Sequence, residues 1–164
     1  MISMVRIDDR LIHGQVAVRW SKELGISRII VVSDTIATNE IQKSALQMAA
    51  PSGVKAAIMP LAKAAKTLND PRAKNLKILV LSNELKYITD LLPLLNDKNP
   101  RLNIANYGRI GGALSDKQKI TDTVYLTNDD KKRLEPLFAN GQDFTYQPLP
   151  EDEPQSLKTL IGGN

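Results

Sequence analysis

The sequence predicts an α/β fold: a single domain with an open, mostly parallel sheet of about seven strands and helices on both faces. Three observations predict it. Apolar runs of strand length alternate with helical segments along the whole of the 164 residues. The run Arg-Ile-Ile-Val-Val-Ser at 28–33 lacks polar alternation, which is typical of a strand buried on both faces. The helical segments between the runs are long enough for right-handed crossovers between parallel strands.

The first half of the chain contains four expected strands, at 1–5, 28–33, 54–59 and 76–81. Apolar residues at helical spacing predict helices between them, at 16–24, 39–50 and 61–68. Gly25 and Pro51 are typical of helix ends, and so is the Asn-Asp-Pro sequence that begins at Asn69.

The second half continues the alternation with shorter strands, expected at 102–105, 123–126 and 144–147. Asn83 is expected to cap a helix that runs to about 95. Thr127 and Asp130 form a T-x-x-D cap for a further helix. The tail from Pro148 is rich in proline and acidic residues, so we expect it to fray or to pack loosely.

Composition excludes several classes of function. The chain has no cysteine, which excludes disulfides, cysteine nucleophiles and thiolate metal sites. Twenty-two basic and eighteen acidic residues give a net charge of +4, without a basic run and with 4% aromatic residues, so nucleic acid is not an expected partner. No signal peptide and no apolar run of roughly 20 residues is found. We therefore expect a cytoplasmic protein that reaches a membrane only by docking on another protein.

One stretch, Arg-Ile-Asp-Asp-Arg-Leu-Ile-His-Gly-Gln-Val at 6–16, joins the first strand to the first helix. It contains His13, the only histidine of the chain. In open α/β sheets the carboxyl ends of the strands and the N-termini of the helices form the ligand crevice. This stretch is therefore the predicted functional site.

His13 is the predicted reactive residue. A neutral imidazole is a good nucleophile near pH 7, and an N-phosphohistidine stays reactive because imidazole leaves readily once it is protonated. Arg10 and Arg6 could bind phosphoryl oxygens through their guanidinium forks. The amides of Gly14 and Gln15, at the start of the helix, supply further donors for an anion.

Asp8 is expected to orient either a ring N–H of His13 or the guanidinium of Arg10. No metal and no cofactor is expected, because no His, Asp and Glu residues share metal-ligand spacing. These residues also have ordinary interpretations: a lone histidine is more often structural, and arginines and aspartates at a strand end are often surface ion pairs. Trp20 is expected to lie in the core.

The 6–16 stretch resembles the active-site loop of the IIB components of the mannose/sorbose family of the bacterial phosphoenolpyruvate-dependent sugar phosphotransferase system. The likeness continues at 28–34, at 43–51 (Lys-Ser-Ala-Leu-Gln-Met-Ala-Ala-Pro) and at 126–127. The resemblance implies that residues 1–164 form one EIIB type-4 domain with the predicted fold. It also implies that Arg10 and Asp8 surround a phosphohistidine at His13, and, by position only, that Ser82 belongs to a further loop at the site.

The resemblance further implies a transferase that works in sugar uptake. Its histidine takes a phosphoryl group from a IIA component and gives it to a sugar held by the membrane components IIC and IID. Two alternatives remain. The first is a non-covalent nucleotide- or sugar-phosphate-binding domain, which the absence of Gly-x-Gly-x-x-Gly after a strand disfavours. The second is a module whose mild positive charge docks an acidic partner.

Overall fold

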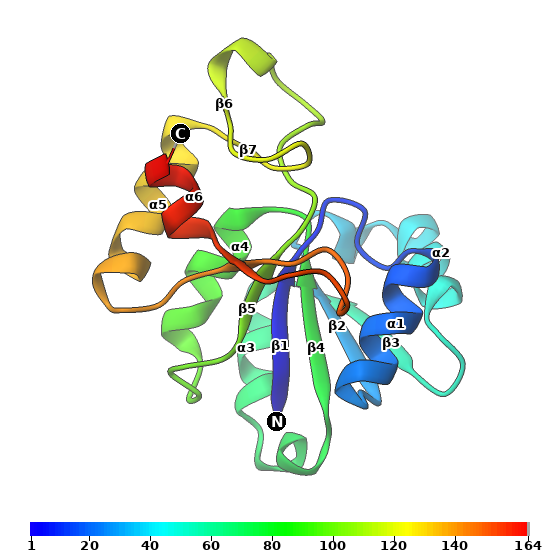
Figure 1. Cartoon of the computed structure of the whole chain (residues 1–164). Helices are drawn as coiled ribbons and strands as arrows, with labels where there is room; N and C mark the ends of the chain where they lie inside the picture. The colour runs from blue at the N-terminus through cyan, green and yellow to red at the C-terminus, as the bar shows by residue number, and fades with distance from the viewer. Residues whose placement is uncertain (164) are drawn as a thin grey trace.

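The computed structural model describes residues 1–163 and confirms the predicted fold class. Seven strands form one sheet, with helices on both faces (Figure 1). In chain order these strands are β1 (Ile2–Ile7), β2 (Arg28–Val32), β3 (Lys55–Met59), β4 (Ile78–Ser82), β5 (Leu102–Ile104), β8 (Thr145–Tyr146) and β9 (Gln155–Ser156). Their order across the sheet is β3-β2-β4-β1-β5-β8-β9, and of these described strands only β9 runs antiparallel to its neighbour.

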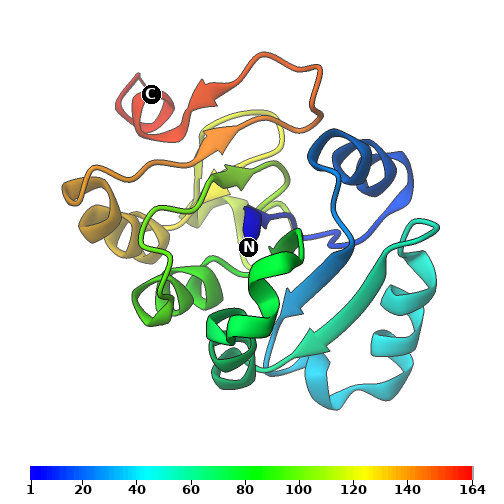
Figure 2. The same ribbon diagram turned by 90° about the horizontal axis from the view of Figure 1, so that it is seen from below.

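The helices form two layers, as the views in Figures 1 and 2 show. One layer consists of α1 (Gly14–Leu24) and α2 (Glu40–Ala49), and the other of α3 (Leu61–Asn69), α4 (Leu85–Leu91) and α5 (Asn128–Ala139). Four short 3-10 segments are η1 (Ile36–Thr38), η2 (Pro71–Asn75), η3 (Leu92–Leu94) and η4 (Leu114–Asp116). Successive strand residues point to opposite faces, so Met4 packs with Trp20 of α1 while Val5 packs with the opposite layer.

β1 and β4 lie side by side near the centre of the sheet, but the chain leaves them in opposite directions. After β1 it passes through α1 to β2, and after β4 it passes through α4 to β5. Such a switch point leaves a crevice at the carboxyl ends of the two strands. The backbone N–H of Asp8, just after β1, donates to the carbonyl of Ser82 at the end of β4 (3.0 Å). The topology therefore places the predicted site at the position typical of ligand binding.

Several local predictions are confirmed, and two need correction. Gly25 ends α1 in the left-handed conformation (φ 61°), and Thr127 with Asp130 forms a full capping box. β1 extends beyond the expected end at Val5 to Ile7. Asn83 does not cap α4. The N-cap position is one residue later and has no side-chain cap, and the Oδ1 atom of Asn83 is buried without a hydrogen-bond partner in the described chain.

The segment expected as a main-sheet strand at 123–126 lies elsewhere. β7 (Tyr125–Leu126) pairs antiparallel with β6 (Gln118–Lys119) in a separate two-stranded sheet, which projects beyond the carboxyl end of the main sheet (Figure 1). The loop at 108–117, which precedes this small sheet, is closed by hydrogen bonds within itself. The ammonium of Lys117 donates to the carbonyls of Gly108 (2.6 Å) and Gly111 (2.5 Å). The chain just before β7 still contacts the segment after β5, because Val124 forms an isolated parallel bridge with Tyr107.

The tail is ordered, against the expectation that it frays. β9 adds an antiparallel edge strand to β8, and α6 (Leu157–Gly163) follows it. Leu157 is fully buried, and the carboxylate of Asp143 accepts hydrogen bonds from the Ser156 hydroxyl and from the Lys158 backbone N–H. Strand pairing and one buried leucine thus hold a segment whose composition suggests looseness.

Helix α2 forms where the apolar spacing predicts it, but most of its apolar side chains are exposed, and only Leu46 packs half-buried against the core. None of its residues is buried, and the side chains of Ile41 and Met48 are each 86% exposed. Asn39 caps it by accepting a hydrogen bond from the backbone N–H of Gln42 (3.0 Å). Its start therefore depends on capping as well as on packing.

Candidate phosphoryl-transfer site

The loop between β1 and α1 presents His13 by turning its apolar side chains inward. Leu11 adopts a left-handed conformation (φ 58°), which costs about 1–2 kcal/mol for a residue with a side chain. Its N–H closes a tight turn onto the carbonyl of Asp8 (2.9 Å). Leu11 and Ile12 are both buried, whereas the side chain of His13 remains 24% exposed at the N-cap position of α1.

Asp8 fixes the ring of His13. Its Oδ2 atom lies 3.2 Å from Nε2 of the ring, and its side chain is fully buried. The other oxygen accepts hydrogen bonds from the backbone N–H of Arg10 (3.0 Å) and from the amide of Asn106 (3.4 Å). A carboxylate accepts hydrogen bonds but cannot donate them, so Nε2 must carry the proton. In the neutral ring, Nδ1 then holds the free lone pair.

Arg6 holds Asp8 from the interior. Its guanidinium is 2% exposed and donates to Asp8 Oδ2 (3.0 Å), to Asn103 Oδ1 (2.6 Å) and to the carbonyls of Gln147 (3.3 Å) and Pro148 (3.1 Å). Burial lowers the pKa of Arg6, and the charge and hydrogen bond of Asp8 oppose that shift. Arg6 lies within β1 rather than in the loop, so it reaches His13 through Asp8.

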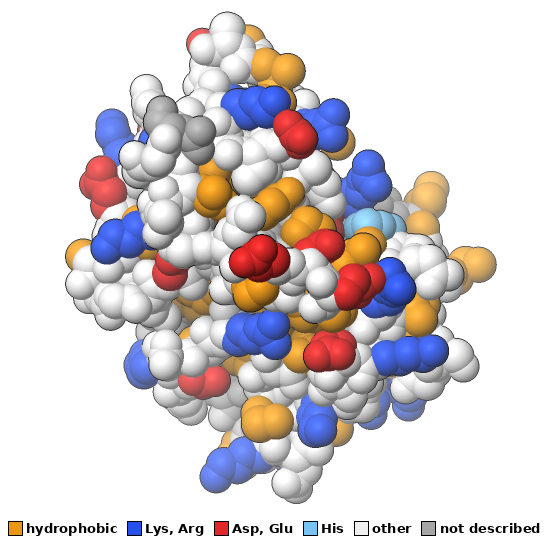
Figure 3. Space-filling model, viewed as in Figure 1, with side chains coloured by type: hydrophobic (Ala, Val, Ile, Leu, Met, Phe, Trp, Pro, Cys, Tyr) orange, Lys and Arg blue, Asp and Glu red, His pale blue; other side chains and the backbone are white. Residues whose placement is uncertain are grey.

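Arg10 has the opposite environment. Its side chain is exposed, and no hydrogen bond or ion pair fixes its guanidinium among residues 1–163. Burial raises the pKa of neighbouring Asp9, as does Asp8, while the charges of Arg10 and Arg109 lower it. Arg109 comes from the loop after β5, so a second exposed guanidinium lies near the site. Figure 3 shows the only histidine at the surface beside basic side chains.

The N-terminus of α1 is open. No side chain caps it, and the carbonyl of His13 accepts the N–H of Ala17 (3.3 Å) as the helix begins. Gly14 and Gln15 are exposed, and Gly14 has a positive φ of 44°. The first backbone N–H groups of a helix have no partner within the helix. They are therefore available to an anion beside the ring of His13.

Ser82 lies deeper than its predicted role requires. Its side chain is fully buried, with the hydroxyl donating to the carbonyl of Val32 (2.8 Å) and accepting from the N–H of Glu84 (3.4 Å). It meets the site through its backbone carbonyl, which binds the N–H of Asp8. The structure thus brings Asp8, Arg10 and His13 together, supports them with Arg6, and keeps the Ser82 hydroxyl in the strand layer.

Sequence reasoning missed three polar residues: Asn103 and Gln147 accept hydrogen bonds from Arg6, and Asn106 donates to Asp8. Asn103 and Asn106 lie in and just after β5, and Gln147 follows β8. A polar residue inside an otherwise apolar strand, as at Asn103, is the signal that could have indicated this role. The core position of Trp20 is confirmed: it is fully buried, its ring N–H donates to the Pro148 carbonyl (2.9 Å), and the Arg6 guanidinium lies 5.7 Å from its ring centroid.

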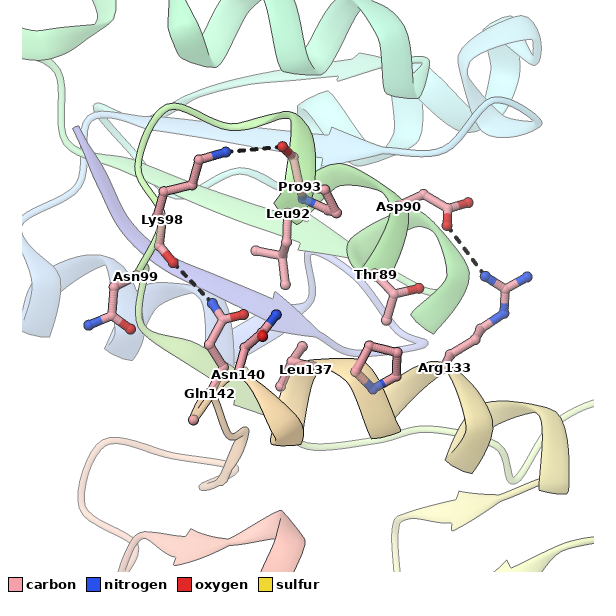
Figure 4. A pocket seen from close by; sticks show the side chains of 12 residues that line it. Thr89, Asp90, Leu92, Pro93, Lys98, Asn99, Arg133, Leu137, Asn140 and Gln142 are labelled. Atoms are coloured by element: carbon pink, nitrogen blue, oxygen red, sulfur yellow. Dashed lines mark hydrogen bonds and ion pairs between the residues drawn. The ribbon is translucent and has the colours of Figure 1, made fainter.

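Two cavities of similar size lie away from His13. One, of about 920 Å³, lies between α4 and α5, where Asp90, Lys98, Arg133 and amide side chains line it (Figure 4). The other, of about 940 Å³, lies along β3 and α3. No residue of the His13 loop lines either of them. The side chain of His13 is itself 24% exposed, so it can be reached from solvent. No described helix is long and apolar enough to cross a membrane, and no three described side chains of metal-binding type converge.

The fold and this loop define a class: α/β domains with a partly exposed histidine at the switch point of a parallel sheet. The family model of the phosphotransferase-system sorbose subfamily IIB component matches residues 2–164. The chain belongs to this family, whose members act as phosphotransferases in sugar transport.

Individual relatives agree. The sorbose-specific EIIB component of Lacticaseibacillus casei is 41% identical, over 98% of this chain and 95% of its own length. The mannose-specific EIIAB component of Escherichia coli K12 is 32% identical over 98% of this chain, which spans 48% of that longer protein. The crystal structure of the IIBSor domain of the sorbose permease from Klebsiella pneumoniae has a TM-score of 0.90 and 26% identity, covering 100% of this chain and 98% of that one.

Proposed function

We propose that His13 is a phosphohistidine carrier. It accepts a phosphoryl group from a IIA component and transfers it to a sugar bound by the membrane components IIC and IID during uptake. The observation that carries the proposal is the contact between Nε2 of His13 and the buried carboxylate of Asp8 (3.2 Å), at the uncapped start of α1. This contact leaves Nδ1 as the nucleophile. The free backbone N–H groups at the start of α1 lie next to it and can bind an anion.

In the first step, the Nδ1 lone pair of His13 forms a bond to phosphorus. The P–N bond of the donor phosphohistidine breaks, and its electron pair returns to the donor ring. The His13 ring keeps the proton on Nε2 and gains positive charge, which the carboxylate of Asp8 stabilises at 3.2 Å. The contact therefore strengthens as the ring becomes charged, which is the requirement for an interaction that accelerates a reaction.

In the second step, a sugar hydroxyl oxygen forms a bond to the same phosphorus and loses its proton to a base on the acceptor side. The P–N bond to His13 breaks, and its electron pair returns to the ring. Because the ring still carries the Nε2 proton, it leaves as a neutral imidazole rather than as an anion. Asp8 thus serves both steps by keeping one proton on one nitrogen.

The phosphoryl oxygens need positive groups on the solvent side of the ring. Arg10 is exposed and no acceptor among residues 1–163 fixes its guanidinium, which is therefore free to bind two phosphoryl oxygens. The N–H groups of Gly14 and Gln15 add donors, and a helix N-terminus contributes about 0.3–1 kcal/mol for an anion. Arg6 supports Asp8 from beneath. Transfer then depends on positioning and electrostatics.

The alternative of a non-covalent nucleotide or sugar-phosphate site has less support. Such ligands are usually held in a cavity that buries most of their surface. The His13 loop lines neither of the two cavities described above. A partly exposed histidine suits a donor that is itself a protein, and the EIIAB relative carries the IIA and IIB names on one polypeptide.

The test is phosphoryl transfer from phosphoenolpyruvate, through the general carrier proteins and a matching IIA component, to this chain. We expect an acid-labile, alkali-stable label on the wild type and none on His13→Ala. Because the chain has one histidine, the label would identify the residue. An unlabelled wild type with a donor that labels a known IIB component would refute the carrier function. Phosphorus NMR of the labelled protein distinguishes Nδ1 from Nε2.

A further inference from the structure

A groove with a basic rim lies along the edge strand β3, mostly toward the amino ends of the strands and thus away from His13. Figure 2 views the molecule from this end. The groove encloses about 940 Å³ between the β2–β3 face of the sheet, α3 and η2. Its volume lies in the range of small-molecule sites, roughly 300–1,000 Å³.

The floor of the groove is apolar. Ile30, Met59 and Ile78 point from three adjacent strands to the face that α3 covers, and each is less than 8% exposed. On the helix side, the groove is bounded by Lys63, Lys66 and Thr67 of α3. Ala64 and Ala65, the buried residues of that helix, pack in the core and do not line the groove.

The rim of the groove is basic. Its five cations are Arg28, Lys55, Lys63, Lys66 and Arg72, and its one carboxylate is Asp70. The carboxylate of Asp70 forms an ion pair with the guanidinium of Arg72 (Nη2 to Oδ2, 2.7 Å), and its hydrogen bonds with Arg72 lower the pKa of Asp70 to about 2. The other four cations form no ion pair with a described residue.

This rim accounts for the net charge of the whole protein. The chain has twenty-two basic and eighteen acidic side chains. Setting aside the five cations and one carboxylate of the groove leaves seventeen of each sign. The groove residues thus carry a net charge of +4, and the charged side chains of the rest of the chain sum to zero. Like charges gathered without counter-charges repel one another and favour an anion between them.

We propose that this groove binds a small amphiphilic anion, with its anionic group among the rim cations and its apolar body on the floor. The site is separate from the proposed phosphoryl transfer and does not depend on it. A polynucleotide is a poorer match, because no aromatic side chain lines the groove for base stacking. A bilayer surface is also a poorer match, because the apolar floor is recessed and none of the large exposed hydrophobic side chains lines the groove.

The test is a fluorescence titration of the full chain with 8-anilinonaphthalene-1-sulfonate, which is itself an aromatic amphiphilic anion, followed by competition with decanoate below its micellar concentration. We expect one saturable site that decanoate displaces. We also expect binding about tenfold weaker for the double variant Lys63→Gln/Lys66→Gln, and weaker binding in 0.5 M salt. The matched control is Lys22→Gln/Lys132→Gln, which removes two exposed lysines from α1 and α5 and should bind like the wild type.

Three results would overturn the proposal. One is equal weakening in the two double variants, which would reduce the effect to net charge. Another is displacement of the probe by inorganic phosphate as effectively as by decanoate, which would remove any role of the floor. The third is the absence of decanoate binding together with cosedimentation on phosphatidylglycerol vesicles, which would assign the groove to a membrane surface. Backbone NMR shifts caused by decanoate should map to Thr67 and Leu76 rather than to His13.

Discussion

The Oδ2 atom of Asp8 lies 3.2 Å from the Nε2 atom of His13, and it lies 3.0 Å from the guanidinium of Arg6 on its other side. One buried oxygen thus joins the partly exposed ring of His13 to a buried cation. This contact sets the tautomer of the ring, so in the proposed transfer Asp8 decides which ring nitrogen attacks phosphorus.

Asp8→Asn should slow phosphorylation of His13 by on the order of 10²-fold or more. An amide can donate to Nε2, which would stabilise the tautomer whose proton lies on Nδ1 and would remove the attacking lone pair. The measurement is the rate of labelling from a phosphorylated IIA component, with circular dichroism to verify folding. Asp9→Asn, at the adjacent position, is the control and should transfer at nearly the wild-type rate. A folded Asp8→Asn protein with an unchanged rate would contradict this role.

Arg10→Ala should lower the transfer rate by on the order of 10²-fold while changing the free energy of unfolding by less than about 0.5 kcal/mol. The guanidinium is exposed and makes no fixed contact within residues 1–163, so its loss leaves no buried partner. Arg10→Lys should be intermediate, because it keeps the charge but loses the two-pronged hydrogen bonding. The rate and a urea denaturation curve are measured on the same samples, with the exposed Lys22→Ala of α1 as control. Loss of stability that parallels loss of rate would assign Arg10 to the fold instead.

Arg6→Met should destabilise the protein by about 3–5 kcal/mol, because it leaves Asp8 buried without its cation. Arg101→Met is the matched control. The guanidinium of Arg101 also lies over the ring of Trp20, at 5.4 Å, but its residue is exposed, so its loss should cost about 1 kcal/mol or less. Urea denaturation followed by the fluorescence of Trp20, the only tryptophan, reports both variants. If both variants lost the same free energy of unfolding, the contact with Trp20 rather than the ion pair with Asp8 would account for the stabilisation by Arg6.

Much of the fold can be predicted from local sequence patterns. The hydrogen-bond partners that hold Asp8 and Arg6 in place cannot. The apolar runs and their alternation with helices predict the sheet, and the charged stretch after the first strand predicts the position of the loop with His13. The buried environment of Arg6 could not be predicted this way, because the acceptors that make burial tolerable come from Asn103 and from residues 147–148, far along the chain. A charged residue next to a strand end is more often at the surface, and only the tertiary fold reverses that preference.

The same distinction explains the tail and the small second sheet. Proline and acidic residues after 147 predict looseness, but β9 is fixed by pairing with β8, which is a contact that composition does not reveal. The apolar residues of β7 satisfy a strand pattern equally well in either sheet. In the fold they pair with β6, while Val124 just before them bridges to Tyr107, whose hydroxyl contacts the capping box of α5.

Tyr107 gives a prediction at alkaline pH. Its hydroxyl donates to Asp130 Oδ1 (2.9 Å), and this carboxylate also caps α5. Burial raises the pKa of the Tyr107 phenol above its usual value of 10.0, and the charge of Asp130 raises it further. The folded state therefore holds this proton more tightly than the unfolded state does. The stabilisation is fully present below pH 10 and is lost as the pH rises above 10 toward the folded pKa, at up to about 1.4 kcal/mol per pH unit.

Tyr107→Phe removes both the hydrogen bond and the titration. At pH 8 the variant should be less stable than the wild type by about 1–3 kcal/mol, because the carboxylate of Asp130 loses a donor. Above pH 10 this difference should shrink, since only the wild type loses stability by ionising Tyr107. Urea denaturation at pH 8, 9.5, 10.5 and 11.5 measures the difference, and absorbance at 295 nm should show one late-titrating phenol missing from the variant. A difference that stays constant across this range would mean that Tyr107 acts only through packing.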